Sequence, residues 1–412
     1  MNEDYFALSY NTLLKVYRDK VFSNIATQNI HSHPQKNTIL KIVNGVLENH
    51  YLLNYYISKL APKNPQQAVR VLLMQSIYCI KLLKMNASAV INLALNTAKE
   101  KGKGEVAGFI GYCLNSAQEE IPLPKDKKQS EQIELNAPLW LISLLKKDYL
   151  KAYKRILSAR SDGTFHLRLK NFADPNAVAA FENEHPTAER TLCGYFVKAD
   201  ESIREYLKKG LAFAQSLTSG YAVLAMGEVQ GKRCLDMCAA PGGKSVYLAQ
   251  RGGIVTSCDI YAHKIKLIED YAKKAEVSLV AMLRDGAEYN KDFADAFDCV
   301  LVDAPCSGTG VISKRQDIIF NRKSEDIAQL TEIQKKLLEN AARYLKREGT
   351  LVYSTCSVLK AENEEVIEAF LTENQDFVLK KIDNLPYNNQ GMLQFLPDNK
   401  LDGFFICSMK KL

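Results

Sequence analysis

Two cysteines, Cys306 and Cys356, each follow an apolar run that predicts a buried strand, residues 300–302 and 350–353. In an open α/β sheet, ligands bind outside the carboxyl ends of the strands. A free cysteine is often only a small buried hydrophobe. Two thiols at the ends of two predicted strands instead favour covalent catalysis, in which a thiolate attacks the substrate.

A second stretch whose residues could bind a ligand is 238–245, CAAPGGKS, after the first predicted strand of the C-terminal half. Its small residues let backbone amides approach a ligand at a helix N-terminus. The phosphate-binding loop G-x-x-x-x-G-K-[ST] is disfavoured because Cys238 stands where its first glycine is required. The dinucleotide fingerprint G-x-G-x-x-G is also absent.

Three carboxylates, Asp259, Asp285 and Asp303, come at the ends of the next three predicted strands. A single aspartate there is often a helix cap or a turn residue. Three together suit a ligand that has a ribose, an adenine and a positive charge, which S-adenosylmethionine combines. The predicted cofactor-binding residues are Cys238, Ala239, Ala240, Pro241, Gly242, Gly243, Lys244, Asp259, Asp285 and Asp303.

From residue 231 onward the apolar pattern alternates between strand and helix, and these elements must position the cysteines and the carboxylates. They predict a doubly wound α/β domain over residues 210–412 with right-handed crossovers. The strands are expected at 233–237, 254–258, 278–282, 297–303 and 349–354, and a last strand at 402–409 pairs in antiparallel fashion with one near 377–381. The helices are expected at 243–250, 262–275, 324–345 and 361–372.

The first 209 residues predict two further domains. Residues 1–125 show apolar positions at helical spacing and predict an all-α domain, with helices over 39–47, 51–60, 66–83, 87–99 and 106–118. Residues 121–132, with two prolines and a lysine-rich run, predict a linker. Residues 126–209 predict this linker and a small α+β domain, with strands at 165–169 and 191–197.

Composition restricts the class of protein. The 412 residues are 47% hydrophobic and 25% charged, as in ordinary globular chains. The net charge is +7, and residues 1–130 carry an excess of that size, which fits a nucleic-acid partner or, equally, a basic face kept for solubility. No apolar run predicts a membrane span, and no secretory signal is recognised. Ten cysteines without a metal-ligand spacing predict reduced thiols in a cytoplasmic protein and no metal site.

Four motifs carry a family resemblance: LDMCAAPGGKS at 235–245, DAPCSGTGVI at 303–312, YSTCSVLKAENEEV at 353–366 and DGFF at 402–405. They resemble the RNA cytosine-5 methyltransferases, within them the bacterial ribosomal RNA enzymes with a NusB-like N-terminal domain (Sun/RsmB type). Residues 315–317, RQD, match the family's basic-then-acidic segment. Ser216 departs from the pattern, since an aspartate is usual there.

The resemblance implies a NusB-like helical domain, a small α+β domain and a Rossmann-like methyltransferase domain that uses S-adenosylmethionine. It implies that Cys356 attacks the base and that Cys306 assists release. Asp303 then holds the cytosine edge, and Lys244 lies near the reacting centre. The expected substrate is single-stranded or flipped RNA, most directly 16S ribosomal RNA, and the expected state is a monomer.

Three alternatives remain at this point. In a DNA cytosine-5 methyltransferase, Cys306 would be the nucleophile and Cys356 incidental. A transfer RNA enzyme would share the same catalytic core. A non-catalytic RNA-binding assembly factor could keep the fold without the activity.

Overall fold

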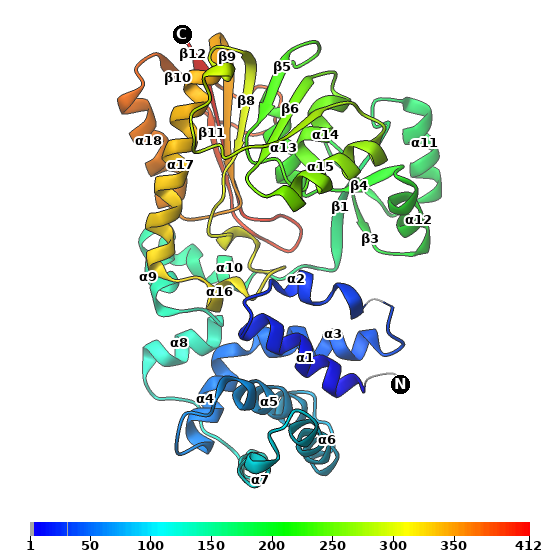
Figure 1. Cartoon of the computed structure of the whole chain (residues 1–412), viewed down its shortest axis with the longest axis vertical. Helices are drawn as coiled ribbons and strands as arrows, with labels where there is room; N and C mark the ends of the chain where they lie inside the picture. The colour runs from blue at the N-terminus through cyan, green and yellow to red at the C-terminus, as the bar shows by residue number, and fades with distance from the viewer. Residues whose placement is uncertain (1–3, 31) are drawn as a thin grey trace. The chain divides into compact units, whose positions relative to one another are not determined.

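The computed structural model describes residues 4–30 and 32–412. The chain divides into two compact units, which we call the helical unit and the α/β unit (Figure 1). The helical unit comprises Met1–Ser158 and Lys314–Lys323, and the α/β unit comprises Ala159–Ser313 and Ser324–Leu412. The three-domain division at 125/126 and 209/210 stays a prediction.

The helical unit is a bundle around a core of aliphatic and aromatic side chains that includes Phe6, Leu13, Ile42 and Leu73. Its α-helices in Met1–Ser158 are α1 (Tyr5–Tyr17), α2 (Ser23–Ala26), α3 (Lys36–Glu48), α4 (His50–Leu60), α5 (Gln67–Ile77), α6 (Ala87–Glu100), α7 (Ala107–Ser116), α8 (Lys127–Leu135), α9 (Leu139–Tyr149) and α10 (Tyr153–Ser158). The helix predicted over 66–83 is continued beyond α5 by a π-helical turn, Tyr78–Leu82.

The linker predicted over 121–132 is wrong in its second half, because α8 begins at Lys127. Asp126 caps this helix, since its carboxylate accepts a hydrogen bond from the Gln129 amide at 2.8 Å. An aspartate cap before a polar helix is a start signal that the lysine-rich run concealed.

The segment Lys314–Lys323 belongs to the helical unit although it lies within the C-terminal half of the sequence. Its short helix α16 (Ile318–Asn321) carries Phe320, which stacks on Tyr17 and on His50 with ring centroids 4.7 and 4.6 Å apart. The Ser23 hydroxyl donates a hydrogen bond to the fully buried carboxylate of Asp317. The family's basic-then-acidic segment is therefore a packed part of the helical unit.

A four-stranded antiparallel sheet opens the α/β unit, in the order β2-β3-β1-β4. Its strands are β1 (Thr164–Leu169), β2 (Glu189–Arg190), β3 (Tyr195–Lys198) and β4 (Ala212–Ala214), and its helices are α11 (Pro175–Glu184) and α12 (Glu201–Lys209). The strand predicted over 191–197 is shorter than expected, since residues 191–194 form a turn. Leu167, Phe181 and Tyr195 form part of the core of this region.

The large sheet contains eight strands, in the order β10-β12-β9-β8-β5-β6-β7, with β11 also paired to β12. They are β5 (Arg233–Asp236), β6 (Ile254–Asp259), β7 (Val280–Leu283), β8 (Phe297–Asp303), β9 (Leu345–Thr355), β10 (Phe377–Leu379), β11 (Met392–Phe395) and β12 (Phe404–Lys411). Strands β5 to β9 pair in parallel, and β12 runs antiparallel to β9 and β10. The strand order reverses between β5 and β8, where a ligand crevice is expected.

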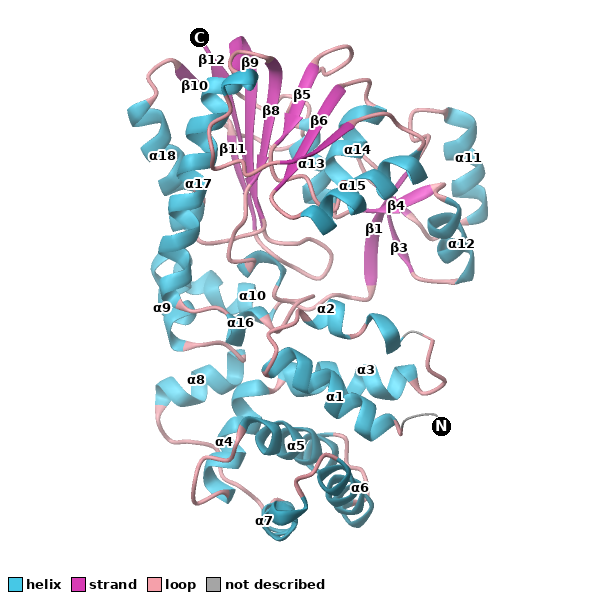
Figure 2. Cartoon of the chain, viewed as in Figure 1, coloured by secondary structure: helices cyan, strands magenta, loops and turns pink. Residues whose placement is uncertain are grey.

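Helices cover both faces of this sheet: α17 (Ser324–Tyr344) and α18 (Glu364–Glu373) lie on one, and α13 (Leu217–Leu224), α14 (Gly243–Gln250) and α15 (Ala262–Ala275) on the other (Figures 1 and 2). Val300 and Val302 of β8 pack with Leu338 of α17. The alternate residue Leu301 packs with Leu248 of α14. This period-two alternation buries both faces of a parallel sheet.

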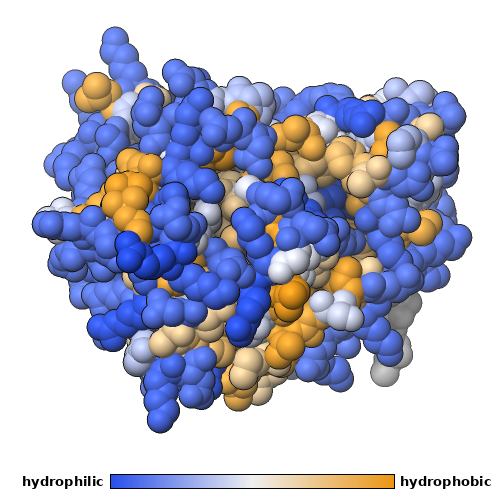
Figure 3. All heavy atoms as spheres, turned by 90° about the horizontal axis from the view of Figure 1, so that it is seen from above, coloured by the Kyte–Doolittle hydropathy of each residue, from blue (hydrophilic) through white to orange (hydrophobic). Residues whose placement is uncertain are grey.

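The predicted doubly wound fold is confirmed, including the antiparallel pair of 402–409 with 377–381. Strand β11 is not predicted from the sequence, because its short MLQF run has no alternation of apolar and polar residues. The face drawn in Figure 3 is mostly hydrophilic, with separate apolar patches. Within the described ranges, no helix is long and apolar enough to cross a membrane.

Candidate active site

The sulfur atoms of Cys306 and Cys356 lie 3.2 Å apart. Cys306 follows β8 and Cys356 follows β9, and these strands pair in parallel, so their carboxyl ends meet at one edge of the sheet. The two loops are also joined through their backbones, since the Gly310 amide donates to the Cys356 carbonyl at 2.9 Å. Two loops more than forty residues apart in sequence therefore form one structure.

The two thiols differ in acidity. The hydrogen bond from Cys306 lowers the pKa of Cys356, and the positive charge of Lys244 acts in the same direction. The same hydrogen bond, together with burial, raises the pKa of Cys306 well above that of an ordinary thiol. A lowered pKa is what a nucleophilic cysteine needs at neutral pH. The pair thus has one sulfur suited to attack and one that keeps its proton.

An ion pair lies next to these sulfurs. Lys244 Nζ is 2.6 Å from Asp303 Oδ2, and both side chains are largely buried. The Ser354 hydroxyl donates to the other carboxylate oxygen, Oδ1, at 2.8 Å. Lys244 comes from the first turn of α14 and Asp303 from the end of β8, so the ion pair lies at the point where the strand order reverses.

A cavity of about 340 Å³ lies at the same end of the sheet. It reaches the lower size range of pockets that hold small ligands. Five of the predicted cofactor residues line this cavity: Cys238, Ala240, Asp259, Asp285 and Asp303. Its wall beside Asp303 includes Pro305, the residue before Cys306. The cavity therefore adjoins the cysteine loops.

Asp259 is the carboxylate at the end of β6. It accepts hydrogen bonds from the backbone amides of Ala240 and Tyr261 at 3.3 and 3.2 Å, and Lys264 Nζ lies 3.4 Å from it. These contacts fix the carboxylate at the cavity wall, where ribose hydroxyls can donate to it. Ile260 and Tyr261, both about half exposed, add apolar surface suited to an adenine ring. The cavity thus fits the adenosyl group of S-adenosylmethionine.

The remaining predicted cofactor residues shape the loop and do not line the cavity. The Ala239 amide donates to the Cys258 carbonyl at 2.8 Å. Gly242 has a φ of +111°, a region that a side chain rarely adopts, and a Cβ on it would lie 3.2 Å from Ile268 Cα. Pro241 is exposed, and Gly243 begins α14. Their binding roles stay predictions.

Sequence reasoning missed several cavity residues, including Ile260, Tyr261, Lys264 and Arg284. All four lie within five residues after β6 or directly after β7. Their position just after a strand end was a usable signal, because ligands bind there in this type of sheet. Ile333 and Leu337 of α17 also line the cavity, and no sequence signal marked them.

Ser216, where the family has an aspartate, is the N-cap of α13. Its hydroxyl accepts a hydrogen bond from the Ser219 amide at 3.3 Å. Serine and aspartate are both preferred N-caps, so the substitution preserves the local role.

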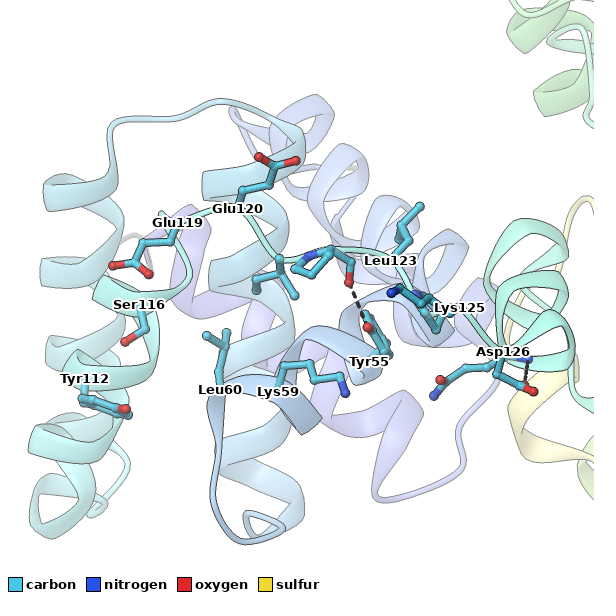
Figure 4. A pocket seen from close by; sticks show the side chains of 14 residues that line it. Tyr55, Lys59, Leu60, Tyr112, Ser116, Glu119, Glu120, Leu123, Lys125 and Asp126 are labelled. Atoms are coloured by element: carbon cyan, nitrogen blue, oxygen red, sulfur yellow. Dashed lines mark hydrogen bonds between the residues drawn. The ribbon is translucent and has the colours of Figure 1, made fainter.

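A larger cavity, about 680 Å³, lies in the helical unit and holds none of the predicted site residues (Figure 4). Lys59 and Lys125 line it together with Glu119, Glu120 and Asp126. This mixed charge gives no preference for an anionic or a cationic ligand. Within the described part of the chain, no cluster of His, Cys, Asp and Glu is placed to hold a metal ion.

Comparison with protein families gives two matches. Residues 223–410 match the family described as 16S rRNA methyltransferase RsmB/F, and residues 7–119 match the NusB family.

Individual proteins agree with these matches. The chain is 31% identical over 442 aligned positions to a probable ribosomal RNA small subunit methyltransferase B from Bacillus subtilis, with 98% of each chain covered. It is 30% identical to the ribosomal RNA small subunit methyltransferase B of Photorhabdus laumondii, covering 85% of this chain and 83% of that one. The crystal structure of PH0851 shares the fold, with a TM-score of 0.86, 20% identity and full coverage of both chains.

Proposed function

The chain belongs to the 16S rRNA methyltransferase RsmB/F family, and from that membership we propose that it methylates carbon 5 of a cytosine in 16S ribosomal RNA through a transient bond from Cys356 to the base. The membership itself makes the chain an S-adenosylmethionine-dependent RNA methyltransferase. The observation that carries the finer proposal is the pair of sulfurs 3.2 Å apart at the end of β8 and β9. A methyltransferase that acts on a nitrogen or a hydroxyl has no need of two adjacent thiols.

The chemistry explains that need. Carbon 5 of cytosine is a weak nucleophile, and addition of a thiolate to carbon 6 makes it enamine-like. When bound, S-adenosylmethionine supplies an electrophilic methyl group. Cys356 is the attacking thiolate, because its pKa is lowered by the hydrogen bond from Cys306 and by Lys244. Carbon 5 attacks the methyl group, whose bond to its sulfur breaks; a base then takes the carbon 5 proton, and the electrons of that C–H bond form the carbon 5–carbon 6 double bond and expel Cys356 as the thiolate.

Asp303 and Lys244 orient the base and compensate its charge. The Asp303 carboxylate lies at the cavity wall and accepts from Lys244 and Ser354. It can bind the protonated N3 and the exocyclic amine of cytosine as negative charge develops in the ring. Cys306, which keeps its proton in the resting site, serves the release step beside the sulfur that must leave.

Cys356→Ser tests the nucleophile. We expect loss of methyl transfer to RNA by about 10³-fold or more, with unchanged binding of S-adenosylmethionine by calorimetry. Substantial residual turnover by this variant would contradict the assignment. If Cys306→Ser loses bond formation to the base while Cys356→Ser keeps it, the roles are those of a DNA-type enzyme.

Cys306→Ser tests the release role. We expect a covalent complex of protein with methylated RNA that survives denaturing electrophoresis, because addition and methyl transfer proceed and elimination does not. Absence of methylated RNA from any such complex would count against this role. Bisulfite sequencing of RNA from cells with and without the chain would identify the cytosine and separate ribosomal from transfer RNA.

We also propose that the protein acts in the cytoplasm as a monomer. All ten cysteines are free thiols, which suits a reducing compartment.

A further inference from the structure

Glu362 is a buried carboxylate that none of the site predictions named. It lies in the turn Lys360–Glu362, which follows the Cys356 loop, and its side chain is fully buried. Oε1 accepts from the Ser307 amide at 2.8 Å and from Gln334 Nε2 at 3.3 Å. Oε2 accepts from the hydroxyls of Ser307 and Ser357, each at 2.6 Å.

The partners of Glu362 lie directly beside the two reactive sulfurs in sequence. Ser307 follows Cys306, and Ser357 follows Cys356. One carboxylate therefore holds the residue after each cysteine, and so links the two loops. The same two hydroxyls also contact each other at 3.3 Å, so the arrangement is a closed network.

The negative charge of Glu362 affects the pKa values of the two nearby thiols. Its four hydrogen-bond donors, the Ser307 amide, the Gln334 amide and the hydroxyls of Ser307 and Ser357, are neutral groups, so none of them pairs the carboxylate with a positive charge. The field of the carboxylate adds to the causes that raise the pKa of Cys306, after the hydrogen bond to Cys356 and burial. On Cys356 the same field also raises the pKa, but there the hydrogen bond from Cys306 and the positive charge of Lys244 oppose it. The charged or titratable groups around the two sulfurs are Lys244, Asp303, Tyr353 and Glu362.

We propose that Glu362 is a positioning residue that makes the two cysteines different: it fixes both loops and keeps Cys306 in its thiol form while Cys356 supplies the thiolate. The catalytic meaning of this difference rests on the proposed function, whereas the difference itself does not. Without the carboxylate, the two sulfurs would compete for one proton more equally, and part of the enzyme would carry the thiolate on the wrong residue.

The substitution Glu362→Gln removes the negative charge of the side chain and keeps its size and shape. The glutamine carbonyl can still accept from the Ser307 amide and Gln334, and its amide can donate to the two hydroxyls, which rotate to accept. The test is alkylation by iodoacetamide from about pH 6 to about pH 10, with each cysteine quantified by peptide mass spectrometry. In the native enzyme we expect Cys356 to react at lower pH than Cys306. In Glu362→Gln we expect the pH at which half of Cys306 is alkylated to fall by about one unit. The difference between the alkylation midpoints of Cys306 and Cys356 should therefore become smaller.

The matched control is Glu365→Gln, an exposed carboxylate on the neighbouring helix α18, which should leave both midpoints unchanged. A second readout is the kinetics of methyl transfer. Glu362→Gln should lower kcat by about tenfold or more, with KM for RNA and the affinity for S-adenosylmethionine unchanged. Glu362→Ala should lower kcat further, since it also removes the link between the loops.

The proposal is overturned if Glu362→Gln, shown to be folded by circular dichroism, keeps the native gap between the two alkylation midpoints. It is likewise overturned if the gap narrows to the same extent in Glu365→Gln. If the native enzyme shows the gap but transfers no methyl group to RNA, the proposed function fails and the role of Glu362 in the thiol pair stands.

Discussion

At the scale of single residues, the site depends on carboxylates in unequal surroundings. Asp303 and Asp259 are paired with lysines. Asp236, at the end of β5, accepts a hydrogen bond from the Ser245 hydroxyl at 2.6 Å and is fully buried. Burial raises the pKa of Asp236 to about 7. A carboxyl group next to the cofactor loop is therefore held close to its neutral form.

Asp236 should make stability depend on pH. The folded protein holds this proton to a higher pH than the unfolded chain, so the contribution to stability is complete at low pH and is lost as pH rises from about 4 through about 7. Asp236→Asn should remove that loss, on the order of 2–4 kcal/mol, and so raise the melting temperature more at alkaline than at acid pH. Thermal unfolding across this range measures it. The exposed Asp376→Asn should change nothing, and a parallel shift at all pH values would refute the argument.

At the scale of elements, the site is built where loops after β8, β9 and before β12 come together without intervening side chains. The Gly403 amide donates a backbone hydrogen bond to the Gly310 carbonyl at 2.8 Å. A Cβ on Gly310 would lie 2.0 Å from the Gly403 carbonyl oxygen and 2.9 Å from that of Cys356. Since both atoms belong to the backbone, neither can move away like a flexible side chain.

Gly310→Ala should therefore push the Cys356 loop out of position. We expect a loss of kcat of about 100-fold, because displacements near 1 Å have effects of this size, and a destabilisation of about 1–3 kcal/mol. Steady-state methyl transfer and denaturant unfolding measure the two effects. Gly111→Ala is the matched control: no atom lies within 4 Å of its added Cβ, and the change lies in α7. Normal activity of Gly310→Ala would contradict this prediction, because it would show that the loops after β8 and β9 can move apart without loss of catalysis.

At the scale of the whole molecule, the chain leaves the α/β unit after Ser313, contributes Lys314–Lys323 to the helical unit, and returns at Ser324. The excursion begins eight residues after Cys306 and leads into α17, whose Gln334 donates to the Pro305 carbonyl at 2.9 Å. Inside the helical unit, Phe320 packs against His50. The packing of Phe320 on His50 therefore helps to hold Lys314–Lys323 within the helical unit.

His50 should make that packing sensitive to acid. Burial, together with the charges of Arg70 and Lys20, lowers the pKa of His50 to about 3. The unfolded chain takes up a proton below about pH 6.5 and the folded chain does not, so stability is complete above that pH and declines as pH falls towards 3.

His50→Phe keeps an aromatic ring against Phe320 and removes the titration. We expect it to flatten the dependence of the unfolding free energy on pH between about 6.5 and about 4, a range over which the native protein loses on the order of 2–3 kcal/mol. Denaturant unfolding at several pH values checks this. His263→Asn, an exposed histidine, is the control, and an unchanged acid slope in His50→Phe would exclude His50 as the cause.

The sequence by itself determined the order of the predicted strands and helices in the C-terminal half, though not β11, because period-two and helical apolar patterns are local properties. It also placed Cys306, Cys356, Asp259 and Asp303 at strand ends, and parallel pairing then brings such ends to one edge. Only the tertiary structure decided that two sulfurs lie 3.2 Å apart, that Glu362 holds the residue after each of them, and that Lys314–Lys323 packs in the helical unit. These features depend on contacts between residues far apart in the chain, and no local pattern encodes them.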